Sequence, residues 1–200
     1  MPETVRRFQT NFTRLKGIRL NDRKAILITG PAGSGKTSLA ERIAQNENWI
    51  HVSEDVHWIE IKKGHPAGEL RTPEEQRIVQ PAVVLQIRDL LLKGNNVVLE
   101  FIIYENPPKP LMYYYEELGK FQCDILVKVL RPSEKVIMAR KKIRGKTDDQ
   151  DYEEELKNTR HQLACIESSY IEDEWIIDNS EMTVEEVYTK CFLAFVEENA

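Results

Sequence analysis

Short apolar runs alternate along the chain with longer segments in which apolar positions recur every three or four residues. The run at residues 25–29 lacks polar alternation, which is typical of a parallel strand buried on both faces. Similar runs predict further strands at residues 49–53, 97–103, 125–130 and 175–177. Helical periodicity predicts helices at residues 36–46, 73–93, 111–120, 132–142, 151–171 and 184–197. Because strands alternate with helices, we expect an α/β fold with a parallel sheet between helical layers.

The first 24 residues differ from the rest of the chain in charge. They hold seven basic and two acidic residues, whereas the whole chain has a net charge of −5. Val5, Phe8, Phe12 and Leu15 share one face of a helix. We therefore expect a basic amphipathic helical extension over residues 1–24. An organelle transit peptide is the alternative, but such peptides are rich in serine and this segment has none.

Composition narrows the class of protein. Hydrophobic residues make up 41% of the 200 residues and charged residues 30%, which is typical of a globular chain. No apolar run reaches the ~18 residues that span a bilayer, and no signal segment opens the chain. The three cysteines are far apart and form no CxxC pattern, so neither disulfides nor a zinc site are expected. We expect a cytoplasmic protein without a membrane partner, and the acidic balance argues against a nucleic-acid partner.

The segment after the first predicted strand fits the Walker A pattern G-x-x-x-x-G-K-[ST] and leads directly into a predicted helix. Its glycines let the backbone turn N–H groups toward a phosphate, and the helix N-terminus adds partial positive charge. The lysine reaches the outer phosphates, and the threonine hydroxyl is placed to bind Mg²⁺. The motif therefore predicts binding of ATP and Mg²⁺ by Gly30, Ala32, Gly33, Ser34, Gly35, Lys36, Thr37 and Ser38.

Acidic residues at the ends of two other strands narrow the chemistry. The chain lacks the Asp-x-x-Gly and Asn-Lys-x-Asp motifs of switch GTPases, and Glu54 and Asp55 follow its second predicted strand. Here it resembles the small P-loop kinases of the adenylate, shikimate and gluconate kinase group, which carry an Asp at this point. The resemblance implies that Asp55 binds the acceptor or acts as the base toward its hydroxyl.

Glu100 ends the third predicted strand in the Walker B layout, with Glu where Asp is commoner. It is a candidate ligand of a Mg²⁺-bound water, together with Thr37. Because Glu is longer than Asp, contact with the acceptor is the alternative, and a purely structural role is a third interpretation.

A basic segment downstream looks like the lid of adenylate kinases. Arg140, Lys146 and Arg160 match the arginine positions of that lid, and Arg144 lies between the first two. The resemblance implies a mobile lid over about residues 140–160 whose cations close on ATP. A charged helix entry at the protein surface is the alternative, because six acids follow between residues 148 and 155.

Residues 175–187 are similar to the last strand, the adenine-side loop and the terminal helix of these kinases, which places Asn179 beside the nucleotide. The capping box of Thr183 and Glu186 opens that helix. The resemblance implies a P-loop kinase domain over residues 25–200. Its fold would be the three-layer P-loop NTPase fold, with a five-stranded parallel sheet flanked by helices and a mobile lid.

The acceptor side departs from the adenylate kinase pattern. Trp58 and Tyr104 occupy the two positions at which those enzymes place arginines for the acceptor phosphate. The candidate acceptor-binding residues are Asp55, Trp58, Glu100, Arg144 and Arg160. We therefore expect Lys36, Asp55 and Arg140 to catalyse transfer of the γ-phosphoryl group from ATP to a hydroxyl of a small molecule. A nucleoside monophosphate kinase with an atypical acceptor site and a non-catalytic ATP-binding regulatory protein are the alternatives. The sequence defines neither the acceptor nor the oligomeric state.

Overall fold

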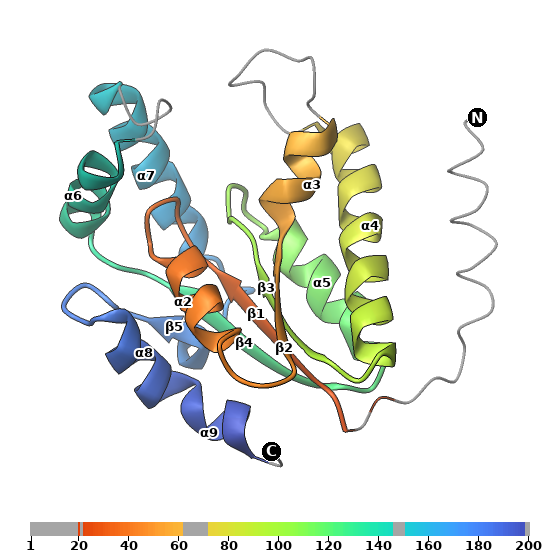
Figure 1. Cartoon of the computed structure of the whole chain (residues 1–200). Helices are drawn as coiled ribbons and strands as arrows, with labels where there is room; N and C mark the ends of the chain where they lie inside the picture. Colours follow the sequence, from red (N-terminus) through yellow and green to blue (C-terminus); the bar gives the residue numbers. More distant parts are fainter. Residues whose placement is uncertain (1–19, 21, 62–71, 146–150, 199–200) are drawn as a thin grey trace.

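The structure is a computed structural model, which describes residues 20, 22–61, 72–145 and 151–198 (Figure 1). Five parallel strands form one sheet in the order β2-β3-β1-β4-β5. Their bounds are Lys24–Thr29 for β1, Trp49–Ser53 for β2, Asn96–Glu100 for β3, Asp124–Leu130 for β4 and Ile176–Ile177 for β5. The predicted five-stranded parallel sheet of an α/β P-loop fold is confirmed.

Helices cover both faces of the sheet (Figure 1). One face packs against α2 (Lys36–Ile43), α8 (Val184–Cys191) and α9 (Leu193–Glu197). The other packs against α3 (Glu54–Ile61), α4 (Pro73–Leu92), α5 (Lys109–Gly119) and the end of α7 (Tyr152–Ile166).

The central strand β1 is buried at every position, and its side chains alternate between the two cores. Ile26 and Ile28 pack with α2, α8 and α9, whereas Ala25 and Leu27 pack with α4 and α5. A parallel strand covered by helices on both faces needs apolar residues on both, which is why its sequence shows no alternation.

Several helices and strands begin or end at other residues than the sequence predicts. The main difference is α3, an unpredicted helix that begins directly after β2. It has few residues, and its buried face includes the charged Glu54, so its apolar pattern is weak. The third strand ends at Glu100 rather than at residue 103, α7 ends at Ile166 rather than at residue 171, and the last predicted helix is divided at Phe192.

Two further expectations concern the ends and the lid. The predicted extension over residues 1–24 lies outside the described residues, apart from Leu20 and residues 22–24. The predicted lid is composed of the end of α6 (Glu134–Arg144) and the first half of α7, while residues 146–150, with Lys146, lie outside the described part. Across the described residues, no helix has the length and apolar character needed to cross a bilayer.

Candidate active site

The Walker A segment forms a tight loop between β1 and α2, at the carboxyl edge of the sheet. A Cβ atom at Gly30 would lie 2.3 Å from the carbonyl oxygen of Leu130, so only glycine fits there. Gly35 has φ of 101° in the left-handed region and caps α2. The ammonium of Lys36 donates to the carbonyl oxygens of Gly30 (3.1 Å) and Pro31 (2.8 Å). The loop therefore presents a helix N-terminus and a cation at one point, as phosphate binding requires.

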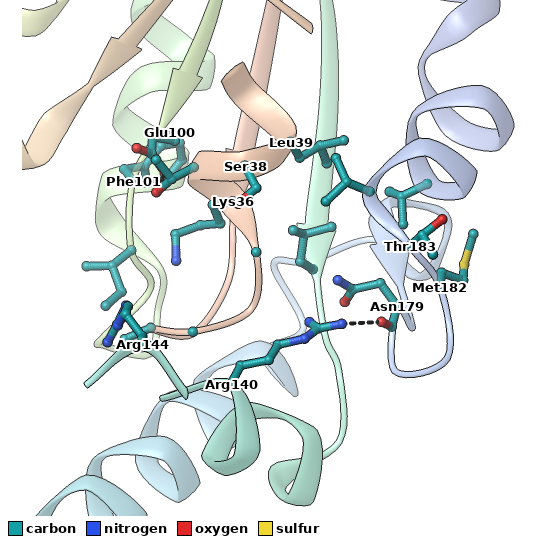
Figure 2. Close-up of a pocket in the computed structure, with 18 of the residues that line it drawn as sticks. Lys36, Ser38, Leu39, Glu100, Phe101, Arg140, Arg144, Asn179, Met182 and Thr183 are labelled. Atoms are coloured by element: carbon teal, nitrogen blue, oxygen red, sulfur yellow. Dashed lines mark hydrogen bonds between the residues drawn. The ribbon is translucent and has the colours of Figure 1, made fainter. Parts of the chain in front are cut away.

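A cavity of about 690 Å³ opens beside this loop. Figure 2 shows Lys36 from the loop, Glu100 from β3 and Arg140 and Arg144 from α6 facing this space. The predicted site residues that line the cavity are Ala32, Gly33, Gly35, Lys36, Thr37, Ser38, Asp55, Glu100, Arg140, Arg144 and Asn179. Gly30 and the buried Ser34 are parts of the loop behind them. The volume is in the range of small-ligand sites, and elements distant in sequence converge on it.

Arg140 and Asn179 both contact the outer side of the phosphate loop. The Arg140 guanidinium donates to the carbonyl oxygens of Ser34 and Asn179, each at 3.0 Å (Figure 2). The Asn179 amide donates to the same Ser34 oxygen at 2.9 Å. Burial lowers the pKa of Arg140 from its ordinary value, but the guanidinium is still charged at neutral pH. These bonds connect α6, the loop before α8 and the phosphate loop.

Glu100 ends β3 directly beside Thr37. Its Oε2 accepts a hydrogen bond from the Thr37 hydroxyl at 2.8 Å, and its Oε1 lies 3.2 Å from His51 Nε2. Burial alone would raise the pKa of this carboxyl, but the bonds from His51 and Thr37 and the charge of Lys36 lower it below its usual value. Glu100 is thus a buried carboxylate with a donor on each oxygen.

The Thr37 hydroxyl and the Glu100 carboxylate together fit Mg²⁺. This ion takes one or two protein oxygens and completes its shell with water and substrate phosphates. Among the residues that the structure describes, no group of three or more His, Cys, Asp or Glu side chains gathers as a metal site. The arrangement therefore suits an ion that arrives with a nucleotide.

His51 is a residue of this site that the sequence did not reveal. It stands on β2, where the parallel register pairs Ser53 with Glu100 and thus brings the two strands side by side. Only knowledge of that strand order would have placed His51 beside Glu100, because the two residues are 49 positions apart.

Asp55 reaches the cavity from the first turn of α3. Its neighbour Glu54 points inward and is buried, where it accepts a hydrogen bond of 2.6 Å from the Tyr114 hydroxyl. Burial first, and then the Glu54 charge, raise the pKa of Tyr114 well above its usual value, so the hydroxyl stays a donor. The buried Glu54–Tyr114 bond fixes the start of α3 and leaves Asp55 on the cavity side.

The structure brings neither Trp58 nor Arg160 to the lining of the cavity. Trp58 lies one turn after Glu54 on the inward face of α3 and is 4% exposed in the core. This corrects the expectation that Trp58 forms a wall for the acceptor. Arg160 on α7 instead forms an exposed ion pair with Glu134 of α6 at 2.8 Å.

A buried lysine that the sequence analysis missed joins α6 to α7. Lys141 is 2% exposed, and its ammonium donates to Glu155 Oε2 at 2.5 Å and to the Thr159 hydroxyl at 2.9 Å. On the next turn of α7, Gln162 Oε1 accepts a bond of 2.8 Å from the Ala32 backbone N–H in the phosphate loop. The pair of helices that carries Arg140 and Arg144 is therefore fixed to itself and to the loop.

Solved structures share this architecture. The tunicamycin resistance protein of Deinococcus radiodurans superposes with a TM-score of 0.63 at 12% identity, over 86% of this chain and 95% of its own. A sugar kinase from Janibacter sp. HTCC2649 gives 0.59 at 19% identity, over 84% and 93%. A gluconokinase from Sinorhizobium meliloti 1021 gives 0.56 at 17% identity, over 86% and 91%. At these identities the likeness establishes the fold alone, an α/β P-loop fold with a five-stranded parallel sheet.

Sequence comparison gives a family as well as a fold. No curated protein matches this chain significantly in sequence. Residues 26–168, which include the phosphate loop, Asp55, Glu100, Arg140 and all of α7, match the family AAA_33, described as an AAA domain. This match covers well over half of the 200 residues, so the chain belongs to the AAA_33 family of AAA domains.

Proposed function

We propose that this protein is an ATP- and Mg²⁺-dependent phosphotransferase that moves the γ-phosphoryl group of ATP to a hydroxyl of a small molecule. The observation that carries the proposal is the convergence of Lys36, Arg140, Glu100 and Asp55 on one cavity. The positive charges of Lys36 and Arg140 can balance the negative charge of a triphosphate, and the Asp55 carboxylate in the same cavity can receive a proton. The structural likeness to a sugar kinase and a gluconokinase supports the same class of reaction.

On the donor side, the phosphate loop and the N-terminus of α2 would hold the β- and γ-phosphates. Lys36 would exchange its two carbonyl contacts for phosphate oxygens, and Arg140 and Arg144 would offset charge from the α6 side. Thr37 and Glu100 would hold Mg²⁺, which neutralises charge on the β- and γ-oxygens when bound.

On the acceptor side, Asp55 would orient the hydroxyl and receive its proton. The hydroxyl oxygen forms a bond to the γ-phosphorus as the bond from that phosphorus to the β–γ bridging oxygen breaks. ADP leaves, the phosphate ester forms, and the hydroxyl proton passes to the Asp55 carboxylate, which balances the reaction.

Nucleoside monophosphates are expected to be poor acceptors. A monophosphate adds about two negative charges, and burying them without paired cations is costly. Trp58, at one of the two expected arginine positions, lies in the core. Tyr104, at the other, accepts a hydrogen bond from Gln76 through its hydroxyl. Neither position offers a positive charge.

The proposal is tested by incubating the protein with Mg-ATP and a panel of hydroxyl-bearing metabolites and identifying phosphorylated products by mass spectrometry. The panel includes AMP, CMP, UMP and GMP. We expect a product that disappears in Lys36→Ala and persists in the surface control Lys109→Ala, whose ammonium pairs with Glu105. Efficient phosphorylation of a nucleoside monophosphate, near ~10⁵ M⁻¹s⁻¹, would favour the monophosphate kinase alternative. Tight ATP binding with no product from any acceptor would favour the regulatory alternative.

A further inference from the structure

We propose that the acceptor carries an apolar portion, which packs against an apolar rim made of Ile102 and Ile143, which line the cavity, and of Ile59 and Tyr104, which follow cavity-lining residues on the same side of their segments. This inference rests on the proposed function and goes beyond it by naming the chemical class of the substrate. The class is an amphipathic alcohol, such as a nucleoside or an aryl-substituted alcohol, rather than a polyhydroxylated acid.

The α6 wall shows the pattern first. Arg140, Ile143 and Arg144 are spaced by three and four residues, so they share one face of α6, and all three line the cavity. Ile143 is 87% exposed, within a last turn that is otherwise basic. A single exposed isoleucine is ordinary on a protein surface. This one stands between two arginines that face a phosphate loop, one turn further out than Arg140.

The α3 wall repeats the pattern on the other side of the cavity. Asp55 lines the cavity, and Ile59 follows it by four residues, so both lie on the same face of α3. Ile59 is 66% exposed. In Figure 1, α3 and α6 stand on opposite sides of the carboxyl edge of the sheet. Each helix therefore brings a charged group close to the phosphate loop and an isoleucine about one turn further out.

The floor between these walls is also apolar. After β3 the burial of side chains alternates along the chain: Phe101 and Ile103 are buried in the core, and Ile102 and Tyr104 are partly exposed. Ile102 lines the cavity. The Tyr104 hydroxyl accepts from Gln76 of α4, and its carbonyl oxygen accepts from His161 of α7 at 2.8 Å. Tyr104 is thus held between α4 and α7.

The arrangement determines which part of an acceptor lies where. The reacting hydroxyl must lie next to Asp55 and the γ-phosphate, and the remainder of the molecule then extends outward to the rim. Covering exposed isoleucine side chains with apolar atoms removes both surfaces from water, which is favourable. A polyhydroxylated acid placed there would exchange water for contacts that cannot hydrogen-bond with its hydroxyls, which is unfavourable.

The test compares acceptors that share a primary hydroxyl and differ in the rest of the molecule. Transfer from Mg-ATP is measured with uridine and 3-phenylpropanol as amphipathic probes, and with gluconate and glycerol as polar probes. The same assays use Ile59→Gln and Ile143→Gln, which keep the helix-forming character of each site and remove its apolar surface. Ile78→Gln is the matched control, because Ile78 is 60% exposed on α4, which contributes no residue to the cavity lining, whereas α3 and α6 both do.

We expect the amphipathic probes to be the better acceptors. For them, kcat/KM falls about tenfold in each cavity variant and stays unchanged in the control, while the KM for ATP is unaffected. A preference for gluconate or glycerol, or equal effects of all three substitutions, would overturn the inference and leave the proposed function intact. An equal loss for every acceptor and for ATP hydrolysis would also overturn it, because the isoleucines would then serve closure of α3 on α6. Absence of Lys36-dependent transfer to any probe would contradict the proposed function itself.

Discussion

The two halves of the cavity are built in opposite ways. On the donor side, Lys36, Arg140 and Asn179 are each held by hydrogen bonds to backbone oxygens, and Lys141 ties the supporting helices together. On the acceptor side, the exposed Asp55 carboxylate lines the cavity from the short helix α3, and the exposed Ile59 lies on the same face of that helix. These backbone hydrogen bonds orient the charged groups of the donor side, as expected where charge must be stabilised at fixed positions. The acceptor side leaves apolar surface for the substrate to cover.

Lys36→Ala removes the phosphate loop's cation from the donor side and has the largest expected effect. The ammonium stabilises charge that develops in transfer, so we expect kcat to fall by 10²-fold or more, about 3 kcal/mol, with the fold unchanged. Steady-state kinetics alongside circular dichroism measures both quantities. Lys109→Ala is the control, and near-normal turnover in a folded Lys36 variant would contradict the role of the phosphate loop.

Asp55→Asn removes the acceptor side's base and keeps its shape. Transfer should fall about 10²-fold while the affinity for ATP, measured by calorimetry, is retained. Asp89→Asn serves as the control, because Asp89 lies on α4 and pairs with Arg88. If the variant instead loses ATP affinity and keeps its turnover at saturation, Asp55 belongs to the donor side and the division between the two sides is wrong.

Glu155→Gln tests how firmly the donor side is supported. The substitution leaves the buried Lys141 ammonium without the carboxylate that balances its charge, although the Thr159 hydroxyl still accepts a hydrogen bond from it. We expect a loss of about 2–3 kcal/mol in the free energy of unfolding, because an uncompensated buried charge is costly. Urea denaturation measures it. Glu134→Gln, which breaks the exposed pair with Arg160, should cost much less, because solvent screens exposed ion pairs, and equal losses would show that the buried pair has no special role.

His51→Phe has the smallest expected effect and separates metal binding from chemistry. Without the donor from His51, the Glu100 carboxylate is less firmly oriented toward Thr37, so the Mg²⁺ concentration for half-maximal ATP binding should rise about tenfold. Manganese binding followed by paramagnetic resonance gives a readout that does not depend on turnover. His57→Phe is the control, because His57 pairs with Gln86 between α3 and α4. An unchanged metal requirement with a reduced kcat would place His51 with the acceptor side instead.

The same division explains what could be predicted from the sequence. The phosphate loop is one short segment whose chemistry needs glycine, lysine and threonine at fixed spacing, so its position could be predicted from the sequence. The unbroken apolar run of β1 likewise predicted a buried parallel strand. The acceptor side depends on α3, whose inward face combines Glu54 with Trp58 and thus hides the helical pattern. Without that helix, Trp58 was taken for a candidate acceptor-binding residue, whereas it lies in the core. His51 and Lys141 act through contacts between separate elements, which no local pattern records.

The central claim is that a phosphoryl group passes from ATP on the donor side to the acceptor on the other side. The most direct test follows the oxygen atoms of that group. The protein is incubated with the best acceptor from the panel and with ATP whose non-bridging γ-oxygens carry a heavy isotope. The masses of the products are then determined by mass spectrometry. The account predicts that all of the labelled γ-oxygens appear in the phosphorylated acceptor, in amounts equal to the ADP formed. Label found only in inorganic phosphate, or ATP recovered intact in a stable complex, would contradict it.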